Sequence, residues 1–228
     1  MHANYASVIS AQDLEIESVG TIHNDTNVDV YATITNPNNR WYTTFSYHFT
    51  FGSYTSPSLQ SFALPGETKT IVGFSLTPPQ GSGTPALVFE HINWKRISNH
   101  AILDYASWAK YRLRITTKNI VYTPPAQLSE NSPLVVSRVT YTAVNKSIFD
   151  YWEVRFLIMG MRDGRPVALQ RKVLSPMTSY EEKTQVVSWF GATQKFDRIS
   201  IETEVDILNP DSYWSSRKGI IGVENITQ

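Results

Sequence analysis

The sequence predicts an all-β protein made of two tandem antiparallel β-sandwich domains. Apolar and polar residues alternate at period two, turn-forming residues interrupt these runs at short intervals, and the second half of the chain repeats the order of the first. Alternation at period two is typical of strands that bury one face. Short strands separated by regular turn signals are typical of sandwiches.

Composition supports a globular fold and excludes several function classes. The 228 residues are 41% hydrophobic and 12% aromatic, which is enough apolar material for a core. The 20 basic and 20 acidic residues cancel, so no bulk electrostatic field favours nucleic acid or an anionic membrane surface. The chain contains no cysteine, which excludes disulfides, thiolate nucleophiles and cysteine-bound metals.

In the first half, two runs carry the clearest alternation, at residues 28–34 and 45–51. The turns that separate the extended runs are Asn36–Asn39, Leu64–Gly66 and Pro78–Gly83, because proline, glycine and asparagine favour turn conformations. These features predict strands that share one buried face.

The second half continues the pattern. Residues 152–158 and 199–207 alternate, and Asp163–Gly164 predicts the tip of a hairpin because glycine adopts the positive φ that such turns need. Residues 100–110 predict at most a short helix. Three tryptophans within or at the ends of predicted strands are core candidates: Trp94, Trp152 and Trp189.

An internal repeat predicts the domain organisation. The two halves match in order through four segments: 14–16 with 113–115, 31–36 with 140–145, 67–70 with 181–184, and 89–97 with 199–207. We therefore expect a first domain at 1–104 and a second at 105–228. We expect the pairs Glu67/Lys69 and Glu181/Lys183 to be exposed charges that discourage edge pairing.

Several of these segments resemble a known family. The runs 29–38, 45–49 and 64–69, with the hairpin at 162–169, are similar to membrane-anchored tandem β-sandwich proteins of candidate-phylum bacteria. Each domain of that family is similar to the FxLYD and late-embryogenesis type of immunoglobulin-like sandwich. The resemblance implies two immunoglobulin-like domains behind an N-terminal anchor outside this sequence, and an extracytoplasmic place at the cell surface. Its motifs are structural, so it implies no catalytic residue.

The sequence offers little for catalysis or metal binding. Its five histidines have no metal-binding spacing, and it has no nucleophile elbow, phosphate loop or dinucleotide fingerprint. We therefore expect no enzyme activity and no cofactor. One oxygen-rich cluster has a weak calcium signal, although a hairpin turn explains it better: Asn24, Asp25, Asn27 and Asp29. A looser group is Asp206, Asn209 and Asp211.

Three aromatic residues are candidate ligand-binding residues because they fall in or beside predicted loops: Trp41, Tyr42 and Tyr54. Exposed rings suit protein partners and also stack on sugars, although loop aromatics often fold back onto a core. The expected function is adhesion, scaffolding or protein interaction at the cell surface. The alternatives are a carbohydrate-binding module and an accessory component of a larger assembly. A homo-oligomer is also an alternative, because the edge strands of open sandwiches can pair between chains.

Overall fold

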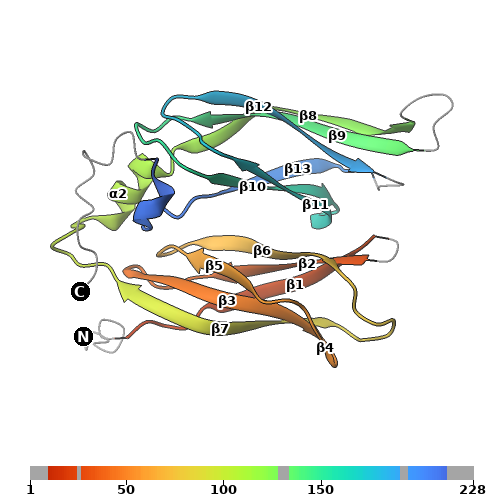
Figure 1. The fold of residues 1–228 in the computed structure, drawn as a ribbon, viewed down its shortest axis with the longest axis horizontal. Helices are drawn as coiled ribbons and strands as arrows, with labels where there is room; N and C mark the ends of the chain where they lie inside the picture. Colours follow the sequence, from red (N-terminus) through yellow and green to blue (C-terminus); the bar gives the residue numbers. More distant parts are fainter. Residues whose placement is uncertain (1–9, 25–26, 128–133, 191–194, 215–228) are drawn as a thin grey trace. The chain divides into compact units, whose positions relative to one another are not determined.

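The computed structural model describes residues 10–24, 27–127, 134–190 and 195–214 (Figure 1). These residues form antiparallel sheets and a short α-helix, which confirms the all-β prediction. The chain divides into two compact units, Met1–Leu103 and Asp104–Gln228. That each unit is a separate domain stays a prediction.

The first unit contains two sheets. One sheet has the order β1-β2-β6, and the other contains β4, β3 and β5, with β7 also pairing with β3. The strand bounds are β1 Glu15–Asn24, β2 Asn27–Thr35, β3 Trp41–Phe51, β4 Tyr54–Thr55, β5 Leu59–Ala63, β6 Thr68–Leu76 and β7 Pro85–Arg96.

The second unit repeats this topology (Figure 1). Its sheets have the orders β12-β9-β8 and β11-β10-β13, which match β6-β2-β1 and β5-β3-β7 of the first unit. The bounds are helix α2 Tyr105–Arg112, β8 Ile115–Gln127, β9 Val135–Asn145, β10 Val154–Arg162, β11 Arg165–Leu174, β12 Glu182–Phe190, β13 Arg198–Glu204 and the 3₁₀ turn η1 Pro210–Ser212. The internal repeat of the sequence is thus a repeat of strand order.

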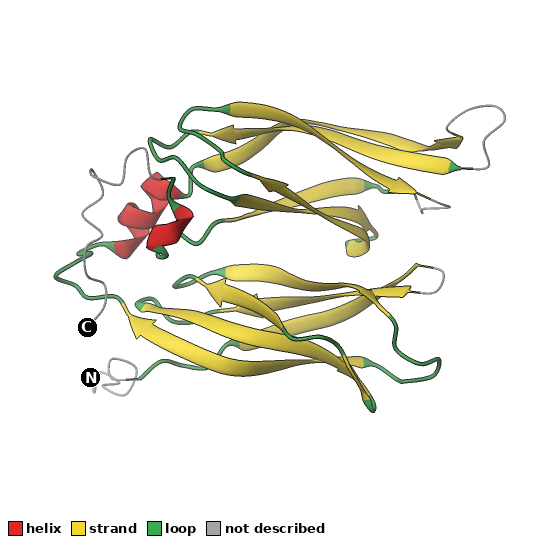
Figure 2. Ribbon diagram, in the orientation of Figure 1, coloured by secondary structure: helices red, strands yellow, loops and turns green. Residues whose placement is uncertain are grey.

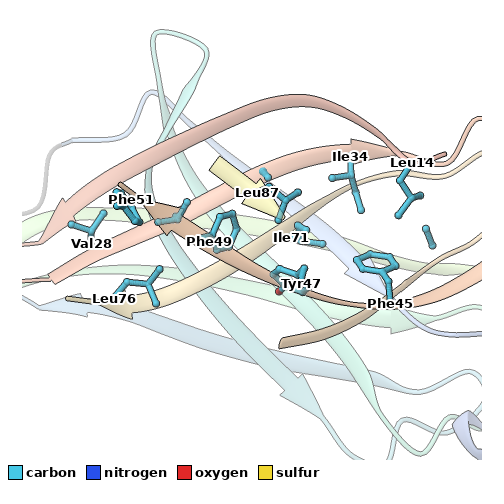
Figure 3. Close-up of a cluster of buried hydrophobic side chains, with 13 residues drawn as sticks. Leu14, Val28, Ile34, Phe45, Tyr47, Phe49, Phe51, Ile71, Leu76 and Leu87 are labelled. Atoms are coloured by element: carbon cyan, nitrogen blue, oxygen red, sulfur yellow. The ribbon is translucent and has the colours of Figure 1, made fainter. Parts of the chain in front are cut away.

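The core of the first unit follows from the alternation of β2 and β3 (Figure 3). Every second side chain of β3 from Phe45 to Phe51 is at most 3% exposed, while the residues between them are half-buried. Val30, Ala32 and Ile34 of β2 are fully buried in the same cluster. Period two therefore predicted the buried face of both strands correctly.

In the second unit, the large side chains of Tyr141, Phe156 and Ile158 are fully buried. Trp189 is 7% exposed and its indole N–H donates to the carbonyl of Leu169, so its predicted place in the core is confirmed. The prediction is wrong for Trp152, which is 53% exposed. Strand β10 begins two residues later, and the Trp152 N–H bonds the Ser212 carbonyl outside the sheets, so the strand alternation does not reach it.

Asn36, which directly follows β2, and Asn145, the last residue of β9, make equivalent hydrogen bonds in the two units. The Asn36 side-chain amide donates to the carbonyls of Trp41 and Leu64, at 2.7 and 3.0 Å. The Asn145 amide donates to Phe149 and Thr178, at 2.8 and 3.0 Å. Both side chains are fully buried, and each ties together two loops at one end of its unit. The turn predicted at 36–39 is confirmed.

The prediction of exposed charges before β6 is wrong. Lys69 is 6% exposed, its ammonium donates to the Phe62 carbonyl at 3.1 Å, and it lies 4.0 Å from the centroid of the Phe62 ring. The Glu67 carboxylate accepts the Leu64 N–H at 2.7 Å. The end of β5 supplies the partner of Lys69, and the loop before β6 supplies the partner of Glu67, so both charged groups hold the β5–β6 connection.

The second unit repeats this arrangement before β12. The Glu181 carboxylate accepts the Thr178 N–H at 2.7 Å and lies 3.1 Å from the Lys183 ammonium. Burial works against ionisation of this carboxyl, but the Thr178 N–H and Lys183 outweigh it and lower the pKa of Glu181.

Candidate functional site

The structure places the three aromatic residues singled out in the sequence on strands. Trp41 and Tyr42 begin β3, and Tyr54 lies in β4. Tyr42 is 5% exposed, and Tyr54 packs on Phe51 with ring centroids 6.1 Å apart. Tyr54 pairs with the last residue of β3 and Trp41 is its first, so about 33 Å of strand separates them. The structure does not bring the three rings together.

The oxygen-rich cluster is held by hydrogen bonds. One oxygen of the Asp29 carboxylate accepts the Asn24 amide and the other accepts the Ser75 N–H, both at 2.8 Å. Asn24 and Asn27 face each other across the β1–β2 hairpin, as the turn interpretation predicts, and Asp25 lies outside the described residues.

The looser group near the end of the chain also caps turns. The Asp206 carboxylate accepts the N–H groups of Leu208 and Asn209, and the Asn209 side chain accepts that of Asp211. Within the described ranges, no three His, Asp or Glu residues come together as metal ligands would.

A different surface gathers aromatic side chains at one end of the second unit. We call it the aromatic end: helix α2 and the loops 146–153, 175–181 and 205–214. These parts meet because β9, β11 and β13 end there, and β8, β10 and β12 begin there. Figure 2 shows the helix and these loops on the same side of the strands.

Backbone hydrogen bonds join the loops of the aromatic end. The N–H and C=O groups of Tyr151 both pair with Met177, at 2.9 Å. Trp152 donates its N–H to Ser212, and Trp214 donates its N–H to Asp150. The three loops are therefore connected to one another, and they present their side chains from a fixed backbone.

Helix α2 is attached to this framework through its last residue. The Arg112 guanidinium lies 3.8 Å from the Trp108 ring centroid and 4.4 Å from that of Phe149, so it is stacked between the two rings. The Tyr151 hydroxyl donates to the Arg112 carbonyl at 2.7 Å. At the other end of the helix, the Asp104 carboxylate caps it by accepting the Ser107 N–H.

Two phenols beneath the surface are structural. Tyr151 is fully buried, and burial raises the pKa of its hydroxyl well above the usual range. Burial raises the pKa of Tyr213 to about 12, although the nearby Arg112 charge opposes this shift. The Tyr213 hydroxyl donates to the Ile207 carbonyl at 2.8 Å. Both groups stay neutral and bonded near neutral pH.

Above this framework, four large side chains face solvent: Tyr111 at 64%, Ile148 at 58%, Trp152 at 53% and Tyr180 at 68% exposed. The backbone that carries Tyr180 is constrained, with φ of +59° and the preceding Ser179 N–H bonded to the Asp150 carboxylate. Large, exposed apolar side chains on a fixed backbone are suited to binding.

Sequence reasoning did not find this surface. It assigned Trp152 to the core and did not select Ile148 or Tyr180. The available signal was position: Ile148 follows the strand-ending asparagine by three residues, and Tyr180 precedes the charged pair that opens β12.

A scan of protein-family models and a search of curated proteins return no match to this chain. Among the residues that the structure covers, no helix has the length and apolar character needed to cross a membrane.

Proposed function

We propose that this chain is a non-enzymatic binding module and that the aromatic end of its second unit contacts a protein partner. The observation that carries the proposal is a group of exposed side chains: Tyr111 on helix α2, and Ile148, Trp152 and Tyr180 on loops joined by hydrogen bonds. Large apolar side chains are costly to leave in water, and fixed loops lose little entropy when they bind.

A protein partner fits this surface better than a sugar. The set includes the aliphatic Ile148, which packs against apolar side chains but does not form a stacking platform for a sugar. Tryptophan and tyrosine are also the residues that most often dominate the energy of protein interfaces. The earlier glycan candidates at Trp41, Tyr42 and Tyr54 are separated along β3 and partly buried.

We further propose that the module works outside the cytoplasm, as the ectodomain of a membrane-anchored surface protein in adhesion or scaffolding. This part rests on the resemblance of segments such as 29–38 and 64–69 to the anchored tandem-sandwich family.

A capture experiment tests the binding surface. The wild-type chain, Trp152→Ala, Tyr180→Ala and the control Leu134→Ala are immobilised and exposed to solubilised membranes of the source organism. Leu134 is 50% exposed and precedes β9, at the end of this strand away from the aromatic end. We expect a partner retained by the wild type and the control to be lost, at least about tenfold, from both loop variants.

Two outcomes contradict this assignment. If the captured proteins are the same for all four chains, the aromatic end is not the contact surface. If the loop variants lose binding on a glycan array while their captured proteins do not change, the carbohydrate alternative replaces the protein partner.

A further inference from the structure

Strand β12 is an edge strand that pairs regularly with β9 and whose second half is uncharged. Among the described residues, no strand pairs with β12 on the side away from β9. Its nine residues pair with β9 without a register shift. From Gln185 to Phe190 it carries no charge, no proline and no glycine, and Val186 and Phe190 are 53% and 70% exposed.

The hydrogen bonds of β9 show which backbone groups of β12 face the open edge. The Asn145 N–H donates to the Glu181 carbonyl directly opposite, so Glu181 belongs to a hydrogen-bonded pair. Alternate residues of an antiparallel pair point toward the partner strand, so the odd-numbered residues bond β9. The N–H and C=O groups of Thr184, Val186 and Ser188 therefore point outward, and the same residues line the outer face of the sheet.

Other long edge strands carry the features that normally block pairing. Strand β8 contains Pro124 and Pro125 and two register shifts, and β11 contains Pro166 and one shift. Strand β6, which matches β12 in the first unit, has a shifted register, and its Val72 carbonyl accepts the Tyr47 hydroxyl at 3.0 Å. Strand β12 has no proline and no register shift over its nine residues.

We propose that two copies of this chain pair through β12, antiparallel and about a twofold axis at Val186. In this register, Val186 lies opposite its own counterpart, Thr184 lies opposite Ser188, and Glu182 lies opposite Phe190. No like charges face each other, whereas a parallel pairing would place Glu182 on Glu182. A second copy fits because it supplies the same uncharged segment Gln185–Phe190 and the same exposed apolar side chains, Val186 and Phe190.

Two outward carbonyls already accept side-chain amides. The Gln185 amide donates to Thr184 at 2.9 Å, and the Gln170 amide donates to Ser188 at 3.5 Å. A second copy would replace both with backbone donors. Because these bonds must be exchanged and the strand is short, we expect a reversible dimer that forms at high protein concentration.

Sedimentation velocity of the whole chain over a concentration series up to about 1 mM tests the pairing. The variant Val186→Lys places a charge on the edge, and Val186→Pro removes an outward N–H without removing a bond to β9. The control is Val121→Lys, because Val121 is 58% exposed and lies in the same cross-strand row through Thr140, but on β8. Thermal melting confirms that each variant is folded.

We expect the wild type and Val121→Lys to dimerise with similar affinity, and both Val186 variants to dimerise at least about tenfold more weakly. A wild type that stays monomeric throughout the series overturns the proposal. Equal weakening by Val121→Lys also overturns it, because that result would indicate contact between outer faces rather than pairing of edges. The outcome is independent of the partner-binding test at the aromatic end.

Discussion

Most buried polar side chains in this protein hold a loop or a turn. Asn36 and Asn145 each donate to a carbonyl of a neighbouring loop, and Lys69 donates to a carbonyl at the end of β5. Tyr141 differs, because its hydroxyl is fully buried and has no hydrogen-bond partner among the described residues. Its ring lies 5.8 Å from that of Phe156, and burial raises the pKa of the phenol well above its usual range. An unpaired hydroxyl in a core costs free energy.

We therefore expect Tyr141→Phe to raise the free energy of unfolding by about 1 kcal/mol, because the ring is kept and only the unpaired hydroxyl is removed. Urea unfolding followed by circular dichroism measures the change. The matched control is Tyr151→Phe, whose hydroxyl donates to the Arg112 carbonyl, and this variant should be less stable than the wild type. A loss of stability in Tyr141→Phe would mean that the hydroxyl has a partner after all.

At single positions, the sequence predicted strand faces well and loop geometry poorly. Phe45, Phe49 and Phe51 are buried as their alternation predicts. Lys69 and Trp152 were misassigned because the environment of each is set by a segment outside its own strand: the end of β5 supplies the Phe62 carbonyl, and the last loop supplies the Ser212 carbonyl. Periodicity describes neighbours along one strand and has no information about such contacts.

At the scale of elements, helix α2 depends on its surroundings. It has eight residues, and isolated helices shorter than about 12 residues are marginal in water. The sequence predicted a short helix at 100–110, whereas the structure begins it at Tyr105 and ends it at Arg112. The difference follows from the Asp104 cap and the stacking of Arg112, two contacts that propensity does not describe.

We expect Arg112→Lys and Arg112→Ala to weaken α2 to a similar degree, by about 1 to 2 kcal/mol, because lysine keeps the charge but cannot stack as a plane between Trp108 and Phe149. Hydrogen exchange of the α2 amides reports this local change. The control Lys110→Ala alters an exposed charge on the same helix and should leave exchange unchanged. If lysine restores protection, charge alone attaches the helix.

At the scale of the molecule, the two units share one strand order and differ in the helix and loops at the ends of their strands. Both use a buried asparagine and a Glu–x–Lys pair to hold the same loops. The second unit adds helix α2 and the buried phenols of Tyr151 and Tyr213. The aromatic end was hard to foresee because it joins four segments separated in sequence, which topology brings together only after folding.

Because burial raises the pKa of Tyr151 and Tyr213, we expect the second unit to lose stability at alkaline pH. The pKa of Tyr213 is about 12 in the fold, and a tyrosine in an unfolded chain titrates near 10. Below about pH 10 both states are protonated and the stabilising contribution is complete. Between about pH 10 and about pH 12 the unfolded state ionises first, so stability is lost as pH rises, by about 2 to 3 kcal/mol from this group.

Urea unfolding at about pH 9, 10 and 11 measures this slope. Tyr213→Phe cannot ionise, so we expect its unfolding free energy to fall less steeply with pH, even though it also loses the bond to Ile207 at every pH. The matched variant Tyr111→Phe removes a phenol that is 64% exposed and should keep the wild-type slope. Parallel slopes for the wild type and Tyr213→Phe would show that burial of this phenol is not what couples the fold to alkaline pH.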